Sequence, residues 1–185
     1  MLNRYTNDYI KEIIQYIMTT ANIDLEIRPD ESGINMSYNF IGHYIGVDFT
    51  RLISAWEEIE APLSLDSYIK TLTIHELGHA VDRAALLESL ERTIEIFRTK
   101  NSNLVSEIYN DRELLSMLME EHEMNIIFEE TAWRNAERLN ADFNFVDHST
   151  LSKVRKHSLT TYQRLYLADL KRYEILSENQ GVKTA

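Results

Sequence analysis

Apolar residues recur at two different spacings along the chain, and the change of spacing separates helices from strands. Between Asn7 and Asn22 they lie three or four residues apart with polar residues between them, which predicts an amphipathic helix. A second helical stretch runs from about Thr50 to Glu60. It should end at Ala61-Pro62, because the residue before a proline is pushed out of the helical region.

Between these two helices the spacing changes to two. Three segments, 23–27, 34–40 and 45–49, alternate apolar residues with mostly polar ones, which is typical of strands with one buried face. Pro29–Gly33 and Asn39–Gly42 contain the residue types that favour turns. We therefore expect three antiparallel strands.

The remainder of the chain has helical spacing almost throughout. One helix begins near Leu65 and ends before Asn101, and the last covers 159–176 behind a Ser158 cap. A helix between them starts near Asp111 and carries Leu114, Leu115, Leu118, His122, Ile126, Glu129, Trp133 and Ala136. The predicted fold class is α+β: one mostly helical domain over residues 1–185 with a small three-stranded antiparallel sheet.

Composition and charge limit the chemistry of such a domain. The 185 residues include 19 basic and 30 acidic ones, a net charge of −11, which repels nucleic acid and anionic membranes. Cysteine is absent, so thiolate catalysis is excluded and a metal would need His, Asp or Glu as ligands. No apolar run could cross a bilayer and the first residues are polar, so we expect a cytoplasmic protein without a signal peptide.

The most informative segment lies in the helix that begins near Leu65. It reads His75-Glu76-Leu77-Gly78-His79. Histidines four apart share one helix face, about 5 to 6 Å apart between Cβ atoms, so both imidazoles can reach one ion at about 2.0 to 2.1 Å. Glu76 points beside such an ion, where a carboxylate can take a proton from water. The segment thus predicts a hydrolytic zinc site.

A catalytic zinc needs a third protein ligand. The extended motif with a third histidine is excluded, because Asp82 and Ala85 stand where it requires glycine and histidine. A glutamate on a later helix is the other common solution. The adjacent Glu129 and Glu130 are both candidates for it.

Residues 74–82 resemble the zinc helix of the gluzincin metallopeptidases. With Ala-Val-Asp after the second histidine, the segment is most similar to the catalytic domains of anthrax lethal factor and the Pro-Pro endopeptidases, and it also resembles ImmA/IrrE-like proteins. The resemblance implies a zincin-like fold in which a small residue follows the ligand glutamate by about one turn. Glu129 with Ala132 matches this pattern, whereas Glu130 has Trp133 there, so the resemblance favours Glu129.

The resemblance also implies roles for residues around the ligands. Lethal-factor-like enzymes place an oxyanion-stabilising tyrosine seven residues before the ligand glutamate, where this chain has His122, which can donate the same hydrogen bond. A solvated His122 within an acidic run is the other interpretation. The alternative donors are Tyr109, Tyr162 and Tyr166.

Two further expectations concern the surroundings of the ligands. Many gluzincins carry an aspartate four residues after the ligand glutamate, where this chain has Trp133, so the residues that support the ligands must differ. Asp82 or Glu130 could orient a ligand imidazole, and an exposed Asp82 in a salt bridge is the other interpretation. Segment 44–49 precedes the zinc helix, which in zincins is the position of the edge strand that pairs with an extended substrate, and Gly46 within it could equally mark a bulge.

Together these residues predict a zinc-dependent metallopeptidase. His75, His79 and Glu129 would hold Zn²⁺, and Glu76 would assist the attack of zinc-bound water on a peptide bond. The expected partner is a peptide or protein substrate, with neither nucleic acid nor membrane as partner, and the sequence leaves the oligomeric state open. The alternative is a non-proteolytic zincin-fold binding or regulatory module with a structural metal, although a structural site has no need of Glu76.

Overall fold

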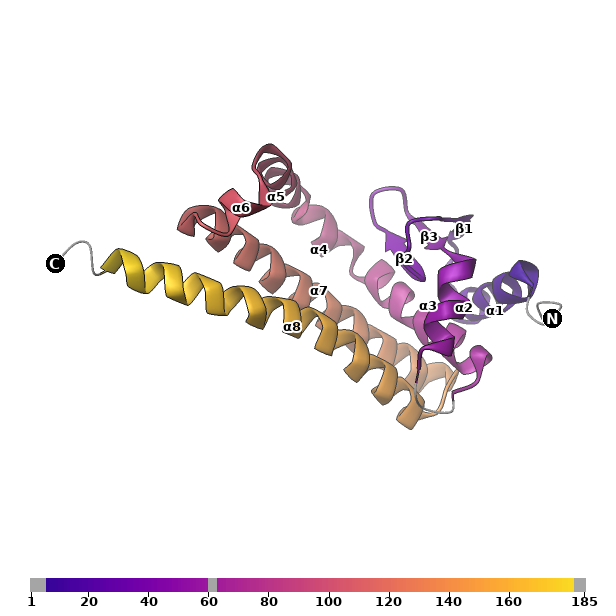
Figure 1. Ribbon diagram of the computed structural model, residues 1–185. Helices are drawn as coiled ribbons and strands as arrows, with labels where there is room; N and C mark the ends of the chain where they lie inside the picture. Colours follow the sequence, from indigo (N-terminus) through magenta and orange to yellow (C-terminus); the bar gives the residue numbers. More distant parts are fainter. Residues whose placement is uncertain (1–5, 60–62, 182–185) are drawn as a thin grey trace. The chain divides into compact units, whose positions relative to one another are not determined.

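The computed structural model describes residues 6–59 and 63–181, so the break expected at Ala61-Pro62 lies outside the described residues. This part of the chain is mostly helical with one small three-stranded sheet, as the sequence predicts (Figure 1). It packs as two compact units, one formed by the residues up to Arg83 with Thr131–Lys156, the other by Ala84–Glu130 with the residues from His157 onwards. The helices α7 (Arg112–Phe143) and α8 (His148–Gly181) each contribute residues to both units. The single domain expected over residues 1–185 stays a prediction.

The first unit begins with the helix that the apolar spacing predicts. In α1 (Asn7–Thr20), the Thr6 side chain accepts a hydrogen bond from the amide of Tyr9. Such a cap satisfies an amide that has no partner within the helix. The buried face of α1 consists of Ile10, Ile14, Ile17 and Met18. The helix packs against α3 (Leu65–Val81).

The sheet is mixed rather than antiparallel. Its strands are β1 (Glu26–Pro29), β2 (Met36–Asn39) and β3 (Tyr44–Val47), in the order β1-β3-β2. β2 and β3 form the expected antiparallel hairpin, but β1 pairs with β3 in parallel. Successive strands do alternate in direction. Because β3 lies between the other two, however, β1 becomes the neighbour of a strand that runs its own way, and the expectation of three antiparallel strands is wrong for that pair.

The helix that carries the histidine motif lies at the centre of the first unit. Between β3 and α3 comes α2 (Phe49–Glu57), close to its predicted bounds and capped by Asp48. α3 begins after Ser64, whose hydroxyl accepts from the Ser67 amide at 3.1 Å. It contacts α1, α2 and β2, so it is buried on several sides rather than along one stripe. The motif residues are thereby held in a rigid setting.

The long helix expected to run from Leu65 to before Asn101 is broken into three. α3 ends at Val81, and α4 (Arg83–Glu88) and α5 (Leu90–Ser102) follow after single-residue interruptions. At the first, Asp82 has φ −98° and ψ 19°, and its amide bonds to the carbonyl of His79, three residues back. Each interruption is a single residue, and Ser89 at the second keeps near-helical angles of φ −78° and ψ −10°, so the apolar spacing could not reveal these breaks.

Two further helices complete the chain after the short α6 (Val105–Ile108), which the sequence did not predict. α7 (Arg112–Phe143) begins where expected, because the Asp111 carboxylate accepts hydrogen bonds from the amides of Glu113 and Leu114. α8 (His148–Gly181) begins earlier than expected. The predicted Ser158 cap is wrong, because Ser158 lies inside α8 and the Asp147 carboxylate accepts from the Thr150 amide instead.

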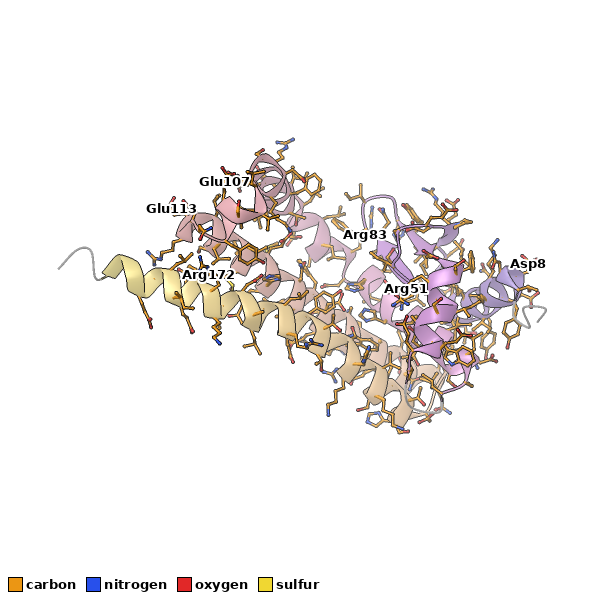
Figure 2. The ribbon with its side chains drawn as sticks, in the orientation of Figure 1. Asp8, Arg51, Arg83, Glu107, Glu113 and Arg172 are labelled. Atoms are coloured by element: carbon orange, nitrogen blue, oxygen red, sulfur yellow. The ribbon has the colours of Figure 1, made fainter. Side chains whose placement is uncertain are left out.

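Within the second unit, polar and apolar contacts hold α6 and α7 to α8. Ile108, Leu115 and Leu118 form a small buried cluster, against which Tyr173 of α8 packs. Arg172, labelled in Figure 2, donates from Nε to the carbonyl of Tyr109 at 2.8 Å. Among the described helices, none is long and apolar enough to span a membrane.

Candidate metal centre

Two histidines of α3 form the base of the candidate site. His75 and His79 are one helical turn apart, and their ring centroids lie 4.8 Å from one another. His75 is 6% exposed and His79 is half-buried. This is the arrangement that the four-residue spacing predicts, because the geometry of one helix fixes it.

A carboxylate from α7 joins the two imidazoles. One ligand atom each from His75, His79 and Glu129 lies within 4.8 Å of the others. The Glu129 side chain is 8% exposed, whereas the neighbouring Glu130 is exposed to solvent and lies outside this group. Of the two glutamates that the sequence offered, Glu129 is the one that the fold brings to the histidines.

The donor set fits a catalytic type of zinc site. Two imidazoles and one carboxylate are protein ligands that leave a fourth position open for water or substrate. In a tetrahedral site with bonds of about 2.0 to 2.1 Å, ligand atoms lie about 3.4 Å apart. The chemistry of the donors does not by itself select zinc over other divalent ions.

A close helix contact brings Glu129 to the histidines. A Cβ atom built on Gly78 would lie 2.1 Å from the carbonyl oxygen of Ala132, so only glycine fits at this point of α3. The buried Asn135 of α7 donates from Nδ2 to the carbonyl of Gly78 at 3.0 Å. Ala132 therefore faces the helix of the histidine motif, as the resemblance implied for the small residue after the ligand.

Trp133 lies against one of the histidines. Its side chain is fully buried, and its ring stacks on that of His75 with centroids 4.2 Å apart and planes inclined by 21°. The residues that the sequence offered for orienting an imidazole are Asp82 and Glu130. In the described part of the chain, neither Asp82 nor Glu130 makes a hydrogen bond to an imidazole.

Glu76 lies beside the ligand group but outside it. The side chain is 6% exposed, and its Oε2 accepts a hydrogen bond of 2.7 Å from the backbone amide of Tyr38 in β2. A hydrogen bond from a backbone amide fixes the orientation of a carboxylate. One Glu76 oxygen is thus held by β2.

β2, rather than β3, runs beside the candidate site. Two contacts join it to α3: Met36 Sδ lies 3.9 Å from the Thr73 hydroxyl, and the Tyr38 amide donates to Glu76. Just beyond both elements, Arg83 Nε of α4 donates to the carbonyl of Phe40 at 2.9 Å. β3 has neighbours on both sides, so the expectation that segment 44–49 forms an edge strand is wrong. The edge strand next to α3 is β2.

Tyr38 and its neighbours add polar groups at this edge. The Tyr38 hydroxyl lies 2.6 Å from Nδ1 of His43. Burial raises the pKa of the Tyr38 phenol, and the positive charge of Arg83 opposes that shift. Sequence patterns gave no signal for the Tyr38 amide or for Arg83, because their places depend on how the sheet lies along α3.

His122, the predicted oxyanion donor, is engaged within the second unit. Its Nε2 lies 2.8 Å from Oδ2 of Asp169 in α8, and the Tyr109 hydroxyl donates to the other oxygen of Asp169 at 2.9 Å. His122 is not a member of the ligand group. The Tyr166 hydroxyl donates to Glu123 at 3.1 Å. The roles of His122 and of the alternative tyrosines remain predictions.

Comparisons of the chain with models of protein families, with curated proteins and with solved structures find no match in any of the three.

Proposed function

We propose that the chain is a zinc-dependent metallopeptidase of the gluzincin type. The observation that carries the proposal is the group of His75, His79 and Glu129, with Glu76 oriented beside it by a backbone amide. The ligands come from helices whose contact requires Gly78. Such a setting holds the ligands in place while one position of the ion stays open.

The residues of the chain would divide the reaction between them. Zn²⁺ held at this centre would supply Lewis-acid chemistry, activating water and polarising a carbonyl. Glu76 would take the proton of the attacking water and return it to the leaving amine. The amide of Tyr38 would hold one Glu76 oxygen in place, so that the other oxygen can carry the proton.

The edge strand beside Glu76 supports an extended peptide as substrate. β2 pairs with β3 on one side, and its other side follows α3 past Glu76 towards Arg83. The Tyr38 amide on this side already donates to Glu76, so a peptide at this edge would pair with the other outward main-chain groups of β2. The scissile carbonyl would thereby be held near the ligands and the base.

The first test is the metal content of protein purified without a metal-binding tag. We expect about one zinc per chain in the wild type and its loss in His79→Ala and in Glu129→Ala. Glu130→Ala is the matched control, because the adjacent exposed glutamate should leave the zinc content unchanged. Wild-type protein that takes up no zinc even when zinc is supplied would refute the proposal.

A second test separates the base from the ligands. Glu76→Gln keeps an oxygen that can accept from the Tyr38 amide but removes the proton acceptor. We expect the zinc content and the thermal stability to stay near those of the wild type, while cleavage of a peptide library falls below detection. Glu88→Gln, on the exposed surface of α4, should cleave at the wild-type rate.

One observation favours the alternative, a non-proteolytic module with a structural metal. The bond between Glu76 and the Tyr38 amide also ties β2 to α3, which gives Glu76 a structural role. That alternative predicts one bound zinc and no cleavage by the wild type. A library screen of zinc-loaded protein therefore decides between the two.

A further inference from the structure

The ring of Trp133 packs against the candidate metal ligand His75. It lies one helical turn after Glu129 on α7, so the same helix carries a candidate ligand and the ring that stacks on another, His75. The indole is fully buried and nearly parallel to the imidazole. The resemblance to gluzincins implies an aspartate at this position. This chain offers an aromatic face there.

A stacked indole can do part of what a hydrogen-bonded carboxylate does for a ligand imidazole. The carboxylate fixes the orientation of the imidazole and makes it a better donor. An imidazole that binds a cation gains positive charge, and the negative face of an indole attracts such a ring. A large buried ring at 4.2 Å also blocks rotation of the imidazole about its bond to Cβ.

We propose that Trp133 is a positioning residue for the metal ligand His75, and that its stacked indole takes the place of an orienting carboxylate. The inference rests on the proposed metal centre. It assigns to Trp133 a role in metal affinity beyond filling the core. Asp82 and Glu130 do not make the hydrogen bonds that would give them this role in the described residues.

The test compares an aromatic with an aliphatic replacement. Trp133→Phe keeps a ring face against His75, whereas Trp133→Leu fills apolar volume without one. We expect zinc affinity, measured by competition with a chelator, to fall about tenfold or more in Trp133→Leu, the range for loss of a group that orients a ligand. In Trp133→Phe we expect it to fall less than about threefold. Trp56→Phe is the control for loss of a tryptophan elsewhere and should bind zinc as the wild type does.

A spectroscopic readout keeps the inference falsifiable if Trp133→Leu does not fold. Trp133 and Trp56 are the two tryptophans of the chain. In Trp56→Phe, the tryptophan emission therefore comes from Trp133 alone. We expect Zn²⁺ to shift that emission and Co²⁺ to quench it. In Trp133→Phe, the emission of the remaining Trp56 should not change.

Two outcomes would overturn the inference in different ways. If the wild type binds zinc, but Trp133→Leu binds it equally well or Zn²⁺ leaves the Trp133 emission unchanged, the stack is a packing contact and the metal centre stands. If the wild type and Trp56→Phe bind no zinc at all, the metal centre itself fails and the positioning role fails with it.

Discussion

Gly78 is the residue on which the approach of α7 to α3 depends. A Cβ at this position would lie 2.1 Å from the Ala132 carbonyl oxygen, and that atom belongs to a helix backbone that cannot move alone. We expect Gly78→Ala to lower the free energy of unfolding by about 1 to 3 kcal/mol, as overpacking does. For a chain of this size that lowers Tm by roughly 2 to 4 °C per kcal/mol, measured by calorimetry. Zinc affinity should fall as well, because Glu129 lies one turn before Ala132.

Val81→Ala provides the comparison for Gly78→Ala. Val81 belongs to the same helix but is 57% exposed, so its truncation should change the free energy of unfolding by less than about 0.5 kcal/mol. Equal stability of the Gly78→Ala and Val81→Ala proteins would show that the close contact at Gly78 is not required.

At the residue scale, local geometry decides what the sequence can predict. The pair His75 and His79, with Glu76 between them, is predictable because it lies within a single helix. The choice of Glu129 over Glu130 depended on the small residue Ala132, which the structure places against Gly78. The Tyr38 amide and the Trp133 stack were not predictable, since each depends on the packing of elements distant in sequence.

At the scale of elements, the start of α8 depends on Asp147. Its carboxylate accepts from the Ser149 hydroxyl and from the amide and hydroxyl of Thr150, and these hydrogen bonds lower the pKa of Asp147 below its usual value of 3.8. A lowered pKa in the folded state means that ionised Asp147 stabilises the fold above the unfolded-state pKa. This contribution is lost as the pH falls through the folded-state pKa.

We therefore expect Asp147→Ala to lower Tm at pH 7. The difference from the wild type should begin to shrink as the pH falls below about 3.8, where Asp147 of the unfolded chain takes up a proton, and should vanish below the lower folded-state pKa, where the cap itself is protonated. Ser152→Ala, an exposed position of α8, should have little effect at any pH. A Tm difference that does not depend on pH would contradict the role of the charge. Thermal unfolding followed by circular dichroism across this pH range measures it.

The placement of β2 beside α3 gives a second prediction at this scale. Arg83 holds the end of the strand through the hydrogen bond from Nε to the Phe40 carbonyl. We expect Arg83→Met, which keeps the apolar stem, to lose about 1.5 to 3 kcal/mol of local stability, the range for a hydrogen bond to a charged group. Amide hydrogen exchange of segment 36–40 should become faster, whereas exchange in α1 should not change. Unchanged exchange in segment 36–40 would show that the other contacts hold β2.

The spacing of apolar residues predicts some elements of this fold and not others. Helical spacing placed α1 and the start of α7 well, because an amphipathic helix reveals its own buried face. Strand direction within the β2–β3 hairpin followed from the short turn between them. The order β1-β3-β2 did not, because alternating apolar residues identify a strand but not its neighbour. Buried Leu151 and Val154 mark the helical spacing that begins α8 before Ser158.

At the scale of the whole molecule, a bound metal would link α3 to α7, whose ligands lie 50 or more residues apart in the sequence. An ion that binds the folded chain and not the unfolded one stabilises the fold by mass action. At about 100 times the dissociation constant, this amounts to about 2.7 kcal/mol. The effect should be visible in the unfolding of the whole chain, and it does not require knowledge of the substrate.

We therefore expect Zn²⁺ to raise the Tm of metal-free protein by about 5 to 10 °C, and a chelator to reverse the rise. His79→Ala and Glu129→Ala should show no such shift, because each lacks a ligand, whereas Glu76→Gln should shift like the wild type. The comparison of Glu76→Gln with the wild type is the critical one, because it separates binding of the ion from catalysis. If His79→Ala shifted as much as the wild type, the ion would bind elsewhere on this acidic chain, and His75, His79 and Glu129 would not be its ligands.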